Sequence, residues 1–137
     1  MCNYHLGQYE EAIAHYDIAK SKHEQNHGDG PLLGQILYNR GLAYSSLMRF
    51  ENAIADQKAA IEATGDGAKI FKMLFQLGIT LRRVANHGAT TQEEKDSRIE
   101  ESIEKLRKAC ELQPNEASAH NNLGLSYFEN EEFENAL

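Results

Sequence analysis

The chain has 137 residues, a length that suits one compact domain or a short array of helical repeats. Its net charge of −7 disfavours a nucleic-acid partner, because a surface that binds phosphate groups needs clustered Lys and Arg side chains. No apolar run approaches the roughly 20 residues that cross a bilayer, so no membrane partner is expected either.

The first predicted helix covers residues 9–25. Its apolar residues recur at the three- and four-residue spacing of a helical stripe, at Tyr9, Ala12, Ile13, Tyr16 and Ala19. The few residues before Gly7 are all that remains of a preceding helix, so residues 1–26 are predicted to be a partial repeat. A glycine-rich segment then ends the helix, and Pro31 suits the first turn of the next one.

Two complete helix pairs are predicted after this partial repeat. The first covers residues 31–66. The second covers residues 67–115 and contains a long loop at 86–92 between its helices. Residues 116–137 begin a further pair, and the sequence stops inside the second helix of that pair. We therefore expect a single array over residues 1–137 that is a fragment of a longer one.

Small residues recur at matching places in these elements. In the first helix of each pair, a glycine precedes an apolar or aromatic residue by three places, at Gly41, Gly78 and Gly124. In the second helices, an aromatic residue precedes an alanine by three places, as in Tyr9 with Ala12, Phe50 with Ala53 and Phe133 with Ala136. The residues and their order resemble the tetratricopeptide repeat. This resemblance implies an all-α fold, a right-handed α-α superhelix (α-solenoid) of antiparallel helix pairs.

The resemblance also implies a binding surface, because in this family the first helix of each pair lines a concave groove. The family's spacing places on that groove Gln35, Tyr38, Asn39, Leu42 and Ser45, then Lys72, Phe75, Gln76, Ile79 and Arg82, and finally Ser118, Asn121, Asn122, Leu125 and Phe128. Amides can bond an extended peptide backbone, and Lys72 with Arg82 can pair with a carboxylate. Leu42, Ile79 and Leu125 have an alternative role in packing between repeats.

The resemblance implies a non-catalytic scaffold that binds a peptide or protein segment along this groove. A second possibility is a structural segment of a large cytoskeletal or ciliary assembly, whose ends contact further repeats or a neighbouring chain. A third is a co-chaperone that clamps the C-terminal carboxylate of a heat-shock chaperone. Asn39 and Lys72 fit that clamp, but Gln76 stands where the clamp has an arginine, which favours the scaffold.

The sequence contains no set of catalytic or metal-binding side chains at spacings that would bring them together in one site. His23 and His27 lie one helical turn apart without an evident third ligand, so we expect no metal, no cofactor and no enzymatic activity. Cys2 and Cys110 are far apart, and the chain begins without a secretory signal. These features indicate a reducing compartment, most simply the cytoplasm. Cys110 is expected to pack as a small apolar side chain.

Overall fold

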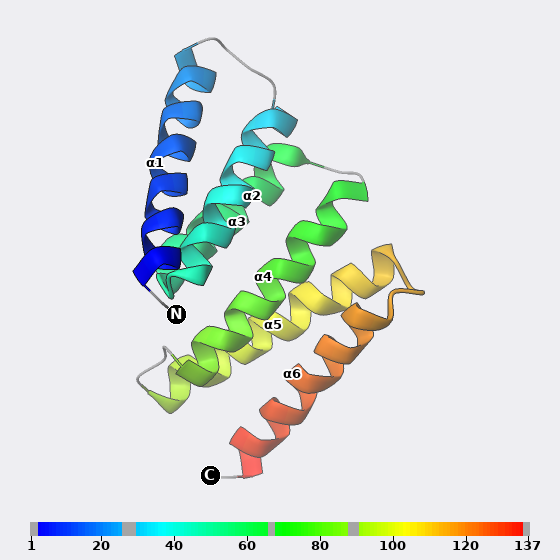
Figure 1. Cartoon of the computed structure of the whole chain (residues 1–137). Coiled ribbons are helices and arrows are strands. Elements are labelled where there is room, and N and C mark those ends of the chain that lie inside the picture. Colours follow the sequence, from blue (N-terminus) through cyan, green and yellow to red (C-terminus); the bar gives the residue numbers. More distant parts are fainter. Residues whose placement is uncertain (1–2, 26–29, 66–67, 88–90, 136–137) are drawn as a thin grey trace. The chain divides into compact units, whose positions relative to one another are not determined.

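A computed structural model describes residues 3–25, 30–65, 68–87 and 91–135. These residues form six α-helices and no strand: α1 (Asn3–Gln25), α2 (Gly30–Ser46), α3 (Phe50–Thr64), α4 (Ala68–His87), α5 (Gln92–Leu112) and α6 (Ala117–Asn135) (Figure 1). The predicted all-α helical-repeat fold is confirmed. The chain divides into two compact units, Met1–Gly67 and Ala68–Leu137.

In the first unit, α2 and α3 form an antiparallel pair and α1 lies beside α2 (Figure 1). Gly41 permits the close approach of α2 and α3, because a β-carbon at this position would lie 3.1 Å from Cγ of Gln57. The buried apolar side chains of this unit are Ile13, Leu37, Tyr38, Ala43, Phe50, Ala53, Ile54 and Ala60. The predicted close crossing at Gly41 and Ala53 is therefore present.

A tight turn joins α2 to α3. Met48 lies in the left-handed region with φ of 60°. The amide of Arg49 donates a hydrogen bond of 2.9 Å to the carbonyl oxygen of Tyr44. The amide of Met48 donates one of 3.0 Å to the carbonyl oxygen of Ser45. These two bonds form a Schellman motif, which satisfies carbonyl groups at the end of α2 and reverses the chain.

In the second unit, α4 and α5 form an antiparallel pair and α6 lies beside α5 (Figure 1). The crossing of α4 and α5 is tight at Gly78, where a β-carbon would lie 2.5 Å from Cγ of Leu106. The buried apolar core of the unit includes Met73, Leu74, Leu77, Leu81, Val84, Ala85, Ile99, Ile103, Leu106 and Ala109. Leu123 anchors α6 because it packs, partly buried, against the cluster of Ala85, Ile99 and Ile103.

The expectation of a separate helix before Gly7 is wrong, because α1 continues without a break from Asn3. Glycine inside a helix costs only about 1 kcal/mol relative to alanine. A turn at this point would also break the helical hydrogen bonds that span it. The continuous helix is therefore the more stable arrangement of this segment.

The expectation of a helix break within residues 116–137 is also wrong for the part of that range that the structure describes, since α6 continues to Asn135. In the first unit, the helical hydrogen bonds that are lost at the Met48 turn are compensated by the packing of α3 on α2. The segment from Glu129 to Asn135 contains no Gly or Pro that would favour a turn, so the helical hydrogen bonds of α6 continue through it.

The predicted loop at 86–92 is shorter in the structure. Its first residues extend α4 to His87, and Gln92 already belongs to α5. Thr91 caps α5, because its hydroxyl oxygen accepts a hydrogen bond of 3.1 Å from the amide of Glu94. A side-chain cap of this kind satisfies one of the free amides at a helix N-terminus, which fixes the start of α5.

Candidate interaction surfaces

A groove of about 240 Å³ lies between α1 and α2 in the first unit. We call it the α1/α2 groove and define it by its lining residues, which are Tyr9, Ala12, Tyr16, Asn39, Leu42, Ala43 and Ser46. Two of these, Asn39 and Leu42, were predicted to lie on a binding surface. Its lining combines apolar and aromatic side chains with hydroxyl and amide groups, so the groove offers both kinds of contact.

Asn39 is oriented by its neighbour on α2. The Nε2 atom of Gln35 donates a hydrogen bond of 3.1 Å to Oδ1 of Asn39. This bond occupies the acceptor side of the amide and leaves Nδ2 without a partner among the described residues. The hydroxyls of Tyr9 and Tyr16 likewise bond no other described residue. The groove therefore presents an amide donor and two phenolic hydroxyls to a ligand.

Arg40 fixes α1, α2 and α3 relative to one another. Its Nε and Nη2 atoms each donate to a carboxylate oxygen of Asp56 over 2.7 Å, and Nη1 donates to Oδ1 of Asp17 over 2.8 Å. The guanidinium also lies 5.9 Å from the ring centroid of Tyr44. The hydrogen bond with Asp56 raises the pKa of Arg40 above its ordinary value. Because Arg40 connects α1 to α2, it helps to set the width of the groove.

The remaining predicted residues of α2 differ in accessibility. Gln35 is exposed, whereas Ser45 is buried and Tyr38 is only 3% exposed. Burial raises the pKa of the Tyr38 hydroxyl. The structure therefore brings Gln35, Asn39 and Leu42 together at or near the groove, and it places Tyr38 in the core of the unit.

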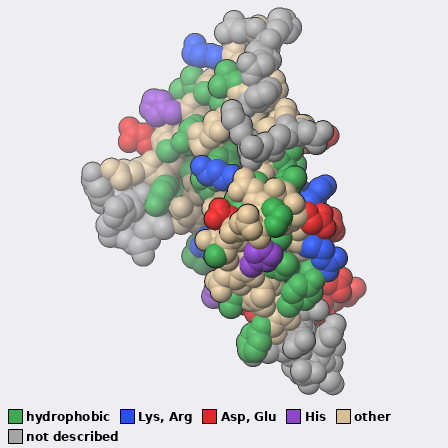
Figure 2. Space-filling model, turned by 90° about the vertical axis from the view of Figure 1, so that its right-hand side faces the viewer, with side chains coloured by type: hydrophobic (Ala, Val, Ile, Leu, Met, Phe, Trp, Pro, Cys, Tyr) green, Lys and Arg blue, Asp and Glu red, His purple; other side chains and the backbone are tan. Residues whose placement is uncertain are grey.

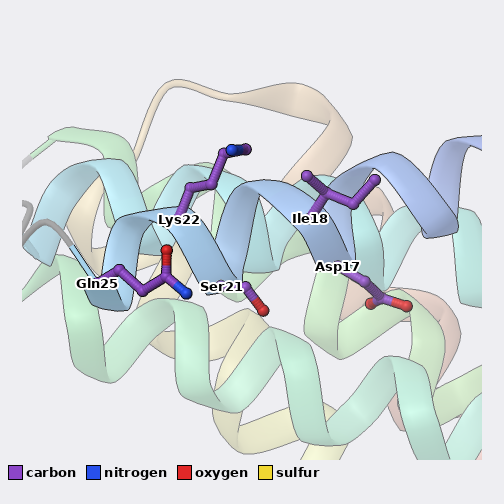
Figure 3. Close-up of a pocket in the computed structure, with 5 residues that line it drawn as sticks. All are labelled: Asp17, Ile18, Ser21, Lys22 and Gln25. Carbon is purple, nitrogen blue, oxygen red and sulfur yellow. The ribbon is translucent and has the colours of Figure 1, made fainter.

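A second hollow, of about 360 Å³, follows one face of α1. Figure 3 shows its lining side chains, with Asp17, Ser21 and Gln25 on one side and Ile18 and Lys22 on the other. All five come from a single helix, and Asp17 is already engaged by Arg40. The α1/α2 groove is the better candidate, because residues from two helices face each other across it.

In the second unit, the predicted residues of α4 form one stripe that we call the α4 face. Lys72 is exposed, and Phe75, Gln76, Ile79 and Arg82 are partly buried. The rings of Phe71 and Phe75 stack, with centroids 6.0 Å apart and an interplanar angle of 18°. Nη1 of Arg82 lies 3.5 Å from the carbonyl oxygen of Asn122, which brings α4 and α6 together at this point.

The predicted residues of α6 lie largely on its outer side. Asn121, Leu125 and Phe128 are exposed, Leu125 by 41% and Phe128 by 59%. Asn122 instead uses its amide within the helix, where Nδ2 donates to the carbonyl oxygen of Ser118 over 2.9 Å. Of the three residues with an alternative role in packing, Leu42 and Ile79 are partly buried and Leu125 is exposed.

Sequence reasoning did not assign Tyr9, Ala12 and Tyr16 to a binding surface. It treated these residues as packing residues because they share the apolar stripe of their helix. The available signal was the pair of tyrosines seven places apart on that stripe, since tyrosine carries a polar group that a fully buried position rarely accommodates. The expected packing of Cys110 is confirmed, as this residue is 8% exposed.

The described residues contain no group of three or more His, Cys, Asp or Glu side chains that could hold a metal ion, and His27 lies outside them. None of the described helices is long and apolar enough to span a membrane. Figure 2 shows Lys and Arg interspersed with Asp and Glu on one face, with apolar side chains between them. The acidic side chains that give the chain its negative net charge are therefore not clustered on that face.

Comparison with known families agrees with this repeat architecture. Residues 1–66 match a family model described as tetratricopeptide repeat, and residues 96–131 match one described as TPR repeat. A search of curated proteins found no match. Repeats of this type generally mediate interactions between proteins and are typically non-catalytic. The two matches cover most of the chain, and the first includes the α2/α3 pair with its close crossing at Gly41. The chain belongs to the tetratricopeptide repeat family.

Proposed function

We propose that the chain is a non-catalytic interaction module that binds an extended segment of another protein on surfaces formed by the first helix of each pair and the helix beside it. The observation that carries this proposal is the α1/α2 groove, where Tyr9 and Tyr16 face Asn39 across a hollow of about 240 Å³. The aromatic rings offer contact area for an apolar side chain, and Nδ2 of Asn39 offers a hydrogen bond to a backbone carbonyl.

The size of the groove limits the affinity. Burial of one large apolar side chain contributes about 1.5–3 kcal/mol, and one hydrogen bond contributes about 1 kcal/mol. The ordering of a flexible peptide opposes these gains. We therefore expect dissociation constants of about 1 mM or weaker from these two contacts alone, and tighter binding for a longer peptide that makes further contacts or for a partner that engages both units.

A display library of random peptides tests the proposal, because it samples many sequences and requires no named partner. Selected peptides are synthesised with a fluorophore, and binding is measured by fluorescence polarisation. Tyr16→Ala and Asn39→Ala are expected to weaken binding by about fivefold or more, whereas Glu62→Ala on the exposed side of α3 should leave it unchanged. Circular dichroism verifies that each variant is folded. Selected peptides that bind the folded groove variants as tightly as the unchanged protein would refute this site.

A second candidate function, a segment of a larger repeat assembly, is favoured by α6. Gly41 and Gly78 each meet a side chain of the following helix, at Gln57 and Leu106, whereas a β-carbon at Gly124 would have no described neighbour within 4 Å. Next to Gly124, the aromatic residue Tyr127 is 41% exposed, although the family pattern places it against a second helix. We infer that this side of α6 accepts a further helix of the repeat type.

Sedimentation measurements over a range of concentrations test this candidate for a second copy of the chain. Association that Gly124→Arg abolishes would support it, since the long side chain blocks the approach of a helix. A monomer at all concentrations would count against self-assembly through α6, and groove binding would then stand as the function.

A further inference from the structure

α1 and α6 each have one side that the described helices do not cover, and the two sides carry different halves of the repeat pattern. α1 has the pattern of a second helix, with Tyr9 three places before Ala12. α6 has the pattern of a first helix, with Gly124 three places before Tyr127. We propose that α6 of one copy of the chain docks on the α1/α2 groove of a second copy, so that two copies associate head to tail. This inference rests on the proposed role of the groove as a protein-binding surface and names its occupant.

The exposure of two alanines shows that α2 covers α1 incompletely. Ala53 and Ala60 on α3 are fully buried, because α2 crosses close to both of them. Ala12 and Ala19 stand at the corresponding places of α1 and are only partly buried. Part of this side of α1 is therefore accessible to a further helix.

The side of α6 around Gly124 is open in a similar way. A β-carbon at Gly124 would have no described neighbour within 4 Å, in contrast to the glycines of α2 and α4. Tyr127 lies on the same side and is 41% exposed, although its hydroxyl accepts a hydrogen bond from Arg107 on α5. The remaining surface of the Tyr127 ring is therefore available for packing.

The α2/α3 pair predicts where α6 of one copy crosses α1 of the other. A β-carbon at Gly41 on α2 would lie 3.4 Å from the carbonyl oxygen of Ala53 on α3. Gly124 has the place of Gly41 in the repeat pattern, and Ala12 has the place of Ala53. We therefore expect Gly124 to cross α1 at Ala12, where small residues on both helices permit a close approach.

The contact between α4 and α6 predicts which side chain enters the groove. Nη1 of Arg82 on α4 lies 3.5 Å from the carbonyl oxygen of Asn122 on α6. Counted from the glycine of each helix, Arg82 corresponds to Phe128 of α6. Asn122 corresponds in the same way to Asn39 of α2, which lines the α1/α2 groove. A docked α6 is therefore expected to place Phe128 of one copy beside Asn39 of the other.

Phe128 suits the chemistry of the groove. Its side chain is 59% exposed on α6, and the groove presents Tyr9, Tyr16 and Leu42 within about 240 Å³. Aromatic rings attract one another in offset and edge-to-face arrangements, and transfer of the phenyl ring from water adds a hydrophobic gain. The Phe128 ring is therefore expected to be the main anchor of the contact.

The charges of the two copies oppose their association. Each copy has a net charge of −7, and α6 contains no Lys or Arg. On α1, Glu10 and Asp17 are already bonded to Arg49 and Arg40 of the same copy. Salt screens the repulsion between like-charged molecules, so an apolar contact should tighten as the NaCl concentration rises. A contact held by ion pairs would instead weaken.

Two variants test the head-to-tail arrangement by complementation. Gly124→Arg blocks α6, and Ala12→Arg blocks the side of α1 that accepts it. Sedimentation velocity of the full chain from about 10 µM to about 1 mM should show association that each variant lacks when it is measured alone. An equimolar mixture of the two variants should form a heterodimer, because one copy retains its groove and the other retains its α6. Circular dichroism verifies that both variants are folded.

The mixture also identifies the wrong arrangement. Association of Ala12→Arg alone at the level of the unchanged chain would overturn the inference, since it would show a contact between two α6 helices. A mixture that remains monomeric would overturn it as well. Association that weakens with increasing NaCl would show that ion pairs rather than the apolar surfaces hold the copies together.

A matched pair of alanine variants tests the anchor. Phe128→Ala is expected to weaken association about tenfold, because it removes the ring that enters the groove. Ile18→Ala removes an apolar side chain of similar exposure, 52%, from a part of α1 outside the groove and should have no comparable effect. Equal weakening by both substitutions would indicate nonspecific association of exposed apolar groups and would refute the inference.

The outcomes separate this inference from the proposed function. If library peptides bind in a Tyr16-dependent way while the chain stays monomeric at about 1 mM, the peptide-binding function stands and the head-to-tail inference is wrong. If the variants complement each other but no library peptide binds, the inference stands and the groove accepts a helix rather than an extended segment. If neither association nor peptide binding occurs, both are wrong.

Discussion

Asp56 on α3 receives two hydrogen bonds from one guanidinium, that of Arg40 on α2, each over 2.7 Å. The Asp56 side chain is only 8% exposed, so its charge is balanced almost entirely by this arginine. The same guanidinium also reaches Asp17 on α1, whose side chain is 54% exposed. One arginine therefore has a buried partner and an exposed partner, and the two contacts differ in energetic weight.

Replacement of Arg40 should destabilise the first unit strongly. Arg40→Met keeps much of the side-chain volume but leaves the buried Asp56 carboxylate without its counter-charge, at an expected cost of about 3 kcal/mol or more. Asp17→Asn removes only an exposed ion pair and should cost less than about 1 kcal/mol. Urea denaturation followed by circular dichroism measures both changes. Equal costs for the two variants would contradict the distinction between the buried and exposed partners.

The double variant Arg40→Met with Asp56→Leu provides a further control. It removes both buried charges, so part of the stability lost in Arg40→Met should return. If the double variant is less stable than the single one by the full cost of a second independent substitution, the Arg40 and Asp56 side chains do not interact as the structure shows.

Gly78 is expected to tolerate no larger residue at the crossing of α4 and α5. In Gly78→Ala, the added β-carbon would lie 2.5 Å from Cγ of the fully buried Leu106, so this side chain would have to shift within the core. We expect a loss of about 1–3 kcal/mol. Gly124→Ala is the matched control, because no described atom lies within 4 Å and alanine favours a helix by about 1 kcal/mol. Thermal unfolding that shows stabilisation by both substitutions would contradict the tight crossing.

The sequence was sufficient to predict the helix pairs and their close crossings. Glycine and alanine at fixed positions restrict where two helices can approach, so Gly41 with Ala53 and Gly78 with its facing helix were identifiable from local patterns. The continuity of α1 and α6 could not be predicted, because it depends on how much packing a neighbouring helix offers. That quantity is absent from a local pattern.

The candidate surfaces were only partly predictable. Tyr38 and Leu42 lie one helical turn apart and belong to the same predicted stripe, yet Tyr38 is buried and Leu42 lines the α1/α2 groove. Helical periodicity predicts approximately the direction in which a side chain points from the helix axis. It does not predict how much of that side chain the adjacent helix covers. The contacts of Arg40 join residues 16 and 23 positions away, and no short-range pattern predicts such pairs.

A chain of hydroxyl groups links three segments of the second unit. The Ser102 hydroxyl donates to the carbonyl oxygen of Gly78 over 2.7 Å and lies 3.0 Å from the hydroxyl of Ser126, and both serines are fully buried. Since Ser102 donates to Gly78, Ser126 is the donor between the two serines. Ser102→Ala therefore leaves a buried hydroxyl unsatisfied, whereas Ser126→Ala leaves the bond to Gly78 intact.

We expect Ser102→Ala to cost about 1–3 kcal/mol and Ser126→Ala about 1 kcal/mol or less. The double variant should cost no more than Ser102→Ala alone, because it removes the unsatisfied hydroxyl. Urea denaturation of the three variants gives this comparison. Additive costs would show that the two hydroxyls do not interact.

Cys110 should react slowly in the folded protein and with a shifted pH dependence. The residue lies on the buried side of α5, and burial raises the pKa of its thiol above the ordinary value of 9.0. The thiolate is the reactive form, so a raised pKa lowers the reactive fraction at any pH below it. The folded state also holds this proton more tightly than the unfolded state, so its contribution to stability is complete below the ordinary pKa and is lost as pH rises through the raised one.

The measurement uses a Cys2→Ser variant, in which Cys110 is the remaining thiol. Iodoacetamide labelling at pH 8, followed by mass spectrometry, should be at least about tenfold slower in the folded protein than in urea. The rate in urea should level off above the ordinary thiol pKa, whereas the rate in the folded protein should continue to rise at higher pH. Labelling of the folded protein at the rate of the unfolded chain would show that Cys110 is accessible, and the close packing around it would then be incorrect.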